Sequence, residues 1–492
     1  MKRKKTVYGI ISLVLAAALS LTACSKQGGQ VNIPGLSGTE GGSGQVKTML
    51  SEARIEYDKV SMNPGILVDL VGYEPDAEKI AVFEGDILPR SFSVVDNKTG
   101  EKIFHGVVEE KIEAAEGTLA CGIGDFSKII EPGDYHIEAE LLGYSKDFSI
   151  SEGIYEKLLK EKFESLRALR FDDSTAEYVP LEDKPETRLE VSGGWTTGEG
   201  GQRDVVDCCL AIFDLIKAYD YFSDALDGVL LAEGSDKRSP ILDEIIYEAN
   251  WLTKLQNRET GGVYTSVTLK KENENDAGKL VIVGETTRAT AYYCAVMANL
   301  SYFLSKTEPE LSKDCLLNAV LAWNCLEANK ELVTESQKFR AAVELYRATG
   351  NASYKEALDE YLKVHADRDF EERLEIDGAM SYMSTSKSVN LDYCTTLMRH
   401  FMSKAERNAI SSKEARYLVE DGVEDEATLL RDVSELVEAD FILTSQEYYK
   451  IEINYLHYFC GRNPESGICT SFSENPDTYA QFMILLGNLL SK

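Results

Sequence analysis

The sequence predicts a multidomain protein in which a small all-β domain precedes a large all-α domain. Between Pro64 and Ile150, apolar and polar residues alternate in short segments bounded by turn residues, which is typical of a small β-sandwich. From Tyr155 onward, apolar residues recur at spacings of three and four, which indicates amphipathic helices. A chain of 492 residues is long enough for both domains.

The N-terminus has the pattern of a bacterial lipoprotein signal. A basic run from Lys2 to Lys5 precedes an apolar stretch, Ile10 to Leu21, that is too short to span a bilayer. The stretch ends in Leu21-Thr22-Ala23-Cys24, which resembles a lipoprotein box. We therefore expect residues 1–23 to be a signal peptide, with a lipid on Cys24 that anchors the protein to the outer face of the cytoplasmic membrane at the bacterial cell surface. The alternative is an ordinary secretory signal with a chance cysteine.

Residues 24–63 are expected to form the lipidated Cys24 and a flexible linker. Gly, Ser and Gln dominate residues 25–46, and such a segment buries too little apolar surface to offset the entropy lost on ordering.

Composition excludes several classes of function. The formal net charge is −31, which argues against nucleic-acid partners because phosphate contacts require a basic face. The cysteines other than Cys24 are odd in number and lack paired spacing, so Cys208 and Cys209 are expected to be buried free thiols. No cysteine and histidine grouping has zinc spacing, and we expect neither a metal nor a cofactor.

Strands and helices are expected in order along the chain. The clearest predicted strands are residues 80–83, 92–95 and 135–139. The predicted helices are 154–170, 204–224, 240–257, 286–305, 311–328, 336–349, 353–365, 391–407, 427–439, 445–460 and 476–490.

Several motifs resemble those of the family 9 glycoside hydrolases, the cellulase-type endoglucanases. Three lie in the β region: Val71-Gly72-Tyr73-Glu74-Pro75, Asp125-Phe126-Ser127 and Pro132-Gly133-Asp134-Tyr135. Five lie in the helical region: Pro240-Ile241-Leu242-Asp243-Glu244, Trp251-Leu252-Thr253-Lys254-Leu255-Gln256, Gly261-Gly262-Val263-Tyr264, Ala341 to Gly350, and Gly461-Arg462-Asn463-Pro464. The resemblance implies an immunoglobulin-like β-sandwich without chemistry of its own at 64–150, and an (α/α)6 barrel at 151–492.

The stretch from Ser192 to Val206 resembles the active-site segment of that family, which reads Gly-Gly-Trp-Tyr-Asp-Ala-Gly-Asp-Tyr-Gly-Lys-Tyr. Without gaps, the two family Asp positions fall on Thr197 and Gly200. The family chemistry is inverting hydrolysis, which needs one carboxylate as base and one carboxylic acid as proton donor.

Two glutamates are the predicted catalytic residues. Glu199 stands beside the family Asp positions and is the candidate base, with a solvated loop residue as the alternative. Asp204 is a second candidate base, and its alternative role is a helix N-cap. Glu474 lies near where the family donor precedes the last helix, although that sequence segment could instead simply start the helix.

The predicted substrate contacts are Trp195, Tyr264, Arg462 and Asn463. Aromatic rings stack on the apolar faces of sugars, and the Gly-Gly-Trp context favours Trp195 in the cleft. The family's His/Arg sugar site after the Arg462 turn is absent, since no histidine follows His457.

The sequence therefore supports a surface-anchored glycoside hydrolase that acts on β-linked oligo- or polysaccharides. The alternative is a non-catalytic glycan-binding or cell-surface interaction protein on the same fold, because both family Asp positions are replaced. A structural surface protein without a sugar site is a third interpretation.

Overall fold

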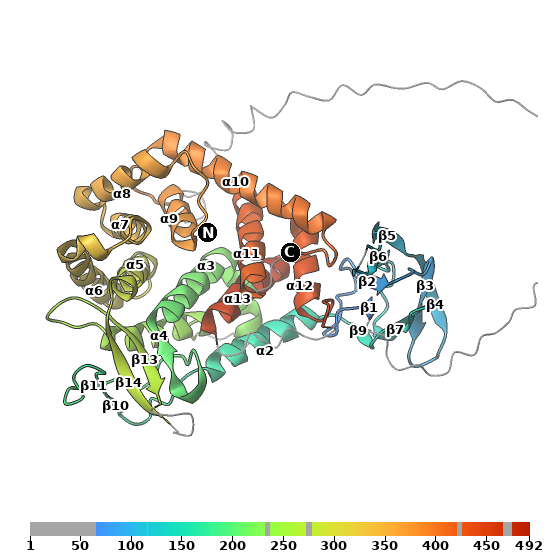
Figure 1. The fold of residues 1–492 in the computed structure, drawn as a ribbon, viewed down its shortest axis with the longest axis horizontal. Coiled ribbons are helices and arrows are strands. Elements are labelled where there is room, and N and C mark those ends of the chain that lie inside the picture. Colours follow the sequence, from blue (N-terminus) through green and yellow to red (C-terminus); the bar gives the residue numbers. More distant parts are fainter. Residues whose placement is uncertain (1–64, 116, 232–236, 272–277, 421–425, 466–474) are drawn as a thin grey trace, which may run out of the picture.

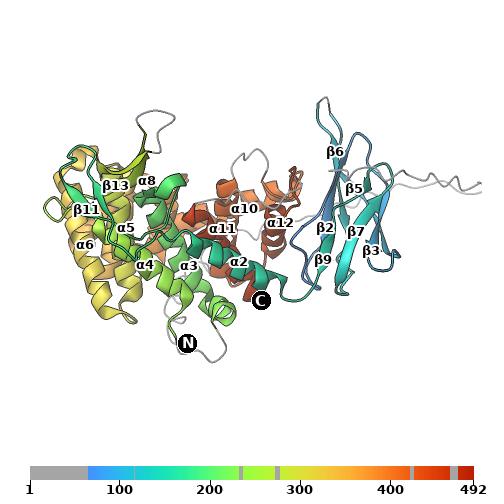
Figure 2. The same ribbon diagram turned by 90° about the horizontal axis from the view of Figure 1, so that it is seen from below.

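The computed structural model describes residues 65–115, 117–231, 237–271, 278–420, 426–465 and 475–492. A β-sandwich stands beside a large helical domain (Figures 1 and 2), which confirms the expected fold class. The signal peptide, Cys24, the linker and Glu474 lie outside the described residues. Within the described ranges, none of the helices combines the length and apolar character that a membrane-spanning segment needs.

The sandwich consists of two antiparallel sheets. One has the strand order β1-β2-β6-β5, and the other has β4-β3-β7-β8, with β9 paired to β7. Phe83, Phe92, Phe126 and Phe148 are buried between the sheets. The strands are β1 (Ile66–Leu67), β2 (Ile80–Gly85), β3 (Ser91–Asp96), β4 (Lys102–Val107), β5 (Glu109–Ile112), β6 (Ala120–Asp125), β7 (Gly133–Ala139), β8 (Gly143–Tyr144) and β9 (Phe148–Ile150).

The helical domain is a ring of helical hairpins. The inner helices pack in the order α13-α3-α5-α7-α9, with α11 against α13, and each inner helix also packs on an outer one. This is an (α/α)6 barrel (Figure 1). The helices are α2 (Ile154–Ala168), α3 (Val205–Leu230), α4 (Pro240–Lys254), α5 (Thr287–Leu304), α6 (Pro309–Ala328), α7 (Glu335–Thr349), α8 (Ala352–His365), α9 (Arg373–Met383), α10 (Leu391–Glu414), α11 (Glu426–Leu443), α12 (Tyr449–Phe459) and α13 (Pro476–Leu490).

One helix and two small sheets of this domain were not predicted from the sequence. Helix α9 contains Gly378, which weakens a helical pattern, but a Cβ there would lie 2.7 Å from the Phe339 ring, so glycine permits close packing on α7. A small sheet joins β12 (Arg203–Asp204) to the hairpin of β13 (Tyr264–Lys270) and β14 (Lys279–Glu285). A further pair, β10 (Tyr178–Pro180) and β11 (Arg188–Glu190), lies beside β14.

A buried histidine joins the two domains. His457 of α12 is 0% exposed, and its Nδ1 lies 2.7 Å from the Asp69 carboxylate while its Nε2 lies 3.0 Å from the Glu78 carbonyl. Because a carbonyl only accepts, Nε2 must carry a proton. The Tyr73 ring covers the imidazole at a centroid distance of 4.7 Å. The interface is therefore built like a domain core, with a polar pair inside it.

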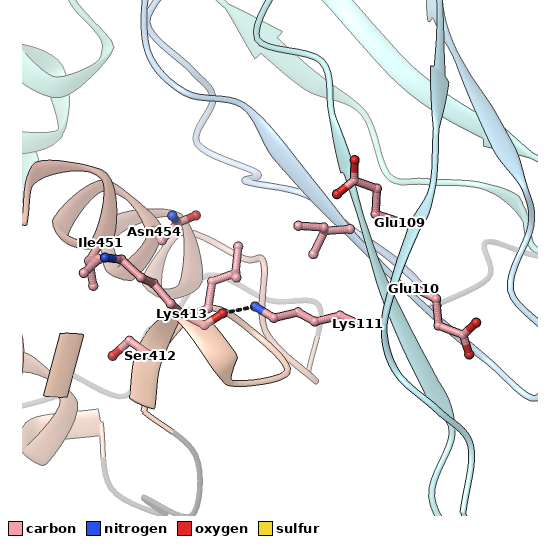
Figure 3. A pocket seen from close by; sticks show the side chains of 9 residues that line it. Glu109, Glu110, Lys111, Ser412, Lys413, Ile451 and Asn454 are labelled. Atoms are coloured by element: carbon pink, nitrogen blue, oxygen red, sulfur yellow. Dashed lines mark hydrogen bonds between the residues drawn. The ribbon is translucent and has the colours of Figure 1, made fainter. Parts of the chain in front are cut away.

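A cavity of about 240 Å³ lies between the domains beside this core (Figure 3). Lys111 of β5 reaches across it and donates to the carbonyl of Lys413 at the end of α10. Of the predicted site residues that the structure describes, none lines this cavity. The lining residues are Glu109, Glu110, Lys111, Ile123, Ser412, Lys413, Leu418, Ile451 and Asn454.

Replacing His457 with Phe is expected to lower the free energy of unfolding by about 3 kcal/mol, because the Asp69 carboxylate would stay buried without its partner. The matched control is Lys450→Ala. Lys450 also bridges the domains, through Glu78 at 2.7 Å, but its side chain is 76% exposed and its loss should cost under about 1 kcal/mol. Denaturant unfolding of the two variants checks this, and equal losses would contradict the buried pair as the main link.

Candidate functional site

The Gly-Gly-Trp segment is buried in the interior of the helical domain. Gly193 and Gly194 have φ angles of +81° and +86°, a region that favours glycine. A Cβ on Gly194 would lie 2.5 Å from the Trp251 ring of α4. The two glycines therefore let the backbone turn directly against this indole.

Trp195 is part of the core and not a sugar platform. Its side chain is 0% exposed, its backbone N–H donates to Glu248 at 2.8 Å, and its indole N–H donates to Glu244 at 3.3 Å. The expected stacking role is corrected by this burial, since no face of the ring is open to a ligand.

Two buried glutamates of α4 hold this segment. Glu244 accepts a two-pronged hydrogen bond from Arg170, at 3.0 and 2.7 Å, so its charge is balanced. Glu248 is 0% exposed, and burial raises its pKa to about 8. The carboxyl of Glu248 is therefore mostly neutral at pH 7.

Arg203 holds the segment from the other side. It is fully buried, donates to the carbonyls of Val191 and Gly193 at 3.0 and 2.7 Å, and pairs with Glu177 at 2.7 Å. Its guanidinium lies 4.2 Å from the centre of the Phe171 ring. The motif residues on both sides of the two family Asp positions thus have structural roles.

The family Asp positions themselves lie on a turn. The Thr197 N–H donates to the Gln202 carbonyl at 2.8 Å, and the Thr197 hydroxyl accepts from the Asp204 N–H at 2.9 Å. Gly200 has a φ of +71° in the short 3-10 turn Glu199–Gly201. Glu199 begins this turn and is exposed, which fits both the predicted base and its alternative, a solvated loop residue.

Asp204 and Asp207 begin the inner helix α3. The Asp204 carboxylate accepts from the N–H groups of Val206 and Asp207, at 2.8 and 3.2 Å, which is the N-cap role named as its alternative. Asp207 is half-buried, and burial together with the nearby Asp204 raises its pKa to about 6, although Arg288 acts in the opposite direction. Asp207 can therefore hold a proton near neutral pH.

The inward side of α3 is polar along its length. Arg373, the first residue of α9, donates to Asp214 and to Asp477 of α13, both at 2.6 Å. Deeper in the barrel, the Lys217 ammonium lies 3.2 Å from the Glu438 carboxylate. Four side chains share this face because they are spaced by seven, three and four residues: Asp207, Asp214, Lys217 and Tyr221.

We use the term barrel mouth for the charged groups at the starts of four inner helices. Burial raises the pKa of Tyr292 of α5, whereas the positive charges of Arg288 and Arg373 both act to lower it. The barrel mouth consists of Asp204, Asp207, Arg288, Arg373 and Asp477. The described residues contain no group of three or more His, Cys, Asp or Glu side chains placed to hold a metal ion.

The remaining predicted substrate residues lie in two places. Tyr264 is half-buried at the start of β13, next to the strand that carries Asp204. Arg462 and Asn463 are 0% and 3% exposed, and the Arg462 guanidinium donates to the Asn454 and Tyr417 carbonyls at the domain interface. The expected sugar contacts of Arg462 and Asn463 are corrected, since both are buried where the domains meet.

Sequence reasoning overlooked Asp207, Arg288, Arg373 and Glu248 as site residues. The spacing of charged residues within the apolar pattern of α3 was a usable signal for Asp207 and Asp214. Arg373 had no signal, because its helix was not predicted. The expected burial of the Cys208 and Cys209 thiols is confirmed.

The chain is similar to known proteins over both domains. The model of the cellulase N-terminal ig-like domain matches residues 61–143, and that of glycosyl hydrolase family 9 matches residues 164–469. Endoglucanase D of Acetivibrio thermocellus is 22% identical over 379 residues, which cover 67% of this chain and 57% of that protein. A xyloglucan-specific endo-beta-1,4-glucanase of Bacteroides ovatus is 25% identical over 344 residues, which cover 63% of this chain and 56% of that protein.

Solved structures share the fold. A metagenome-derived glycoside hydrolase family 9 endoglucanase has a TM-score of 0.74 at 19% identity, covering 87% of this chain and 99% of that one. A Bacteroides ovatus GH9 protein has a TM-score of 0.71 at 18% identity, covering 88% and 100%. The chain spans little more than half the length of the curated relatives that it matches. Because the family model spans more than half of the 492 residues, the chain belongs to glycosyl hydrolase family 9.

Proposed function

We propose that the protein hydrolyses β-linked glycans at the barrel mouth. Membership of glycosyl hydrolase family 9 supports this reaction class, and the two curated relatives are an endoglucanase and a xyloglucan-specific glucanase. The observation that carries the proposal is the half-buried carboxyl of Asp207, which stands at the start of α3 with a pKa raised to about 6 by burial. Glycosidases need one such carboxyl in its acidic form.

The roles divide between an acid and a base. Asp207 supplies the proton to the leaving oxygen, and Arg288 beside it favours the carboxylate that is left after the transfer. Glu199, exposed on the turn before α3, activates the attacking water. Glu474 was expected to be the donor from sequence and lies outside the described residues, so it is the competing candidate for the acid.

A second candidate function is glycan binding without hydrolysis. It is favoured by Thr197 and Gly200, which occupy the positions of the two family aspartates and cannot accept a proton from water. Binding would use the same mouth, with Tyr264 as a half-exposed aromatic contact. A lack of turnover together with measurable affinity would identify this function.

Replacing Asp207 with Asn is expected to lower turnover about 10²- to 10⁴-fold, because the proton donor is lost while shape is kept. Reducing-sugar release by residues 47–492 on β-glucans, xylans and mixed-linkage oligosaccharides measures it. Glu199→Gln and Glu474→Gln test the base and the competing acid in the same assay. Asp243→Asn is the matched control, because Asp243 is an exposed acid in the first turn of the outer helix α4.

Turnover that is unaffected by Asp207→Asn but lost in Glu474→Gln would identify Glu474 as the proton donor. No turnover on any glycan would contradict hydrolysis. Calorimetric titration of the same glycans then decides whether the protein binds them.

We also propose that a lipid on Cys24 anchors the protein to the outer face of the cytoplasmic membrane. The basic residues Lys2 to Lys5, the short apolar stretch and the Leu21 to Cys24 box support this. The linker through residue 63 would then let the two domains extend from the membrane surface.

Replacing Cys24 with Ala is expected to move the protein from the membrane fraction of cells to the soluble or secreted fraction, because the lipid would have no attachment site. Fractionation with an antibody against the folded domains checks this. Retention of the variant in the membrane fraction would contradict the anchor.

A further inference from the structure

Two buried acids of α4 face the Gly-Gly-Trp segment from one side of the helix. Glu244 and Glu248 are four residues apart, so they lie on the same face of the helix, about one turn apart. Glu244 pairs with Arg170 at 2.7 Å, whereas Oε2 of Glu248 accepts from the Trp195 N–H. Glu248 is fully buried, and the Cys208 thiol of α3 also lies close to its carboxyl.

The residues that lead from Trp195 to the barrel mouth are also held by hydrogen bonds. Next to the Trp195 N–H that Glu248 holds, the Thr196 N–H donates to the Leu169 carbonyl at 2.8 Å. The neighbouring Thr197 accepts from the Asp204 N–H at 2.9 Å.

Asp204 in turn accepts from the Asp207 N–H at 3.2 Å. Trp195 and Thr197 therefore both fix the chain segment that leads from the two glycines to Asp207. A shift at Trp195 would be passed on to the proposed proton donor.

We propose that Glu248 is a positioning residue for the barrel mouth, acting through its hydrogen bond from the Trp195 N–H. The inference rests on the proposed function, since it assigns Glu248 a part in placing Asp207 and Glu199. What this role requires is an acceptor oxygen at the position of Oε2, and it requires no negative charge. An amide at residue 248 should therefore replace the carboxyl, and an apolar side chain should not.

Three substitutions separate these requirements. Glu248→Gln keeps an acceptor oxygen in place, Glu248→Leu removes it at similar size, and Glu248→Asp withdraws it by one methylene group. Hydrogen exchange of the amides in residues 192–204 reports the local effect, and the amides of α7 serve as the internal reference.

Glu248→Leu is expected to speed exchange at Trp195 to Thr197 by about tenfold or more, with α7 unchanged, because a buried hydrogen bond is lost. In Glu248→Gln, the exchange rates of these amides should stay within about twofold of the native protein. In Glu248→Asp, the rates should lie between those of Glu248→Gln and Glu248→Leu. On a soluble glycan, Glu248→Leu should lower kcat with KM within about twofold, and Glu248→Gln should restore kcat.

Each outcome bears on the proposal. If Glu248→Leu exchanges like the native protein at Trp195 to Thr197, or if Glu248→Gln behaves like Glu248→Leu, the positioning role is overturned. Faster exchange in α7 as well as at residues 192–204 would mean a general loss of stability, which also overturns it. If Glu248→Leu does not fold, Glu248→Asp decides by the same comparison.

Failure of the proposed hydrolytic function can be distinguished from failure of the positioning role. A native protein without turnover on any glycan removes the kinetic readout, while the exchange experiment still tests whether Glu248 places the segment.

Discussion

The architecture of the site depends on burying a non-helical segment of backbone, residues 191–195, inside a mainly helical domain. Such a segment carries peptide groups that no helix satisfies, and each buried group needs a partner. Glu248 and Arg203 supply partners from opposite sides, to the Trp195 N–H and to the carbonyls of Val191 and Gly193. Buried polar side chains are costly unless they are bonded in this way, so the segment and its partners stabilise each other.

This constraint divides the family motif into a structural part and a chemical part. Gly194 and Trp195 touch buried groups of α4, and any larger or differently placed group would disturb the core. Thr197 and Gly200 lie instead on the turn that leads to α3, where Thr197 is half-buried and Gly200 is exposed. The fold can thus be retained while the positions of the family aspartates hold other residues, and function must be argued from the carboxyls that are present.

The fold was predictable because the spacing of apolar residues indicates strands and helices, and because several sequence motifs meet packing requirements of the fold. The roles of single residues were harder, because burial is a tertiary property. Trp195 has the family context of a cleft residue but is held in the core by two glutamates, and Arg462 lies in a turn that closes against the β-sandwich. Asp207 comes near Arg288, and Arg373 comes to pair with Asp214 and Asp477, only after α3, α5, α9 and α13 are assembled, which no local pattern reveals.

The central claim is that Asp207 delivers a proton at the barrel mouth, and the pH dependence of kcat/KM on a soluble β-glucan oligosaccharide tests it most directly. Since burial raises the pKa of Asp207 to about 6, the acidic form is lost above that pH. The account predicts that kcat/KM falls about tenfold per pH unit above roughly pH 6, and that this limb disappears in Asp207→Asn. A native profile that stays flat from about pH 6 to 8, or a falling limb that persists in the variant, would contradict it.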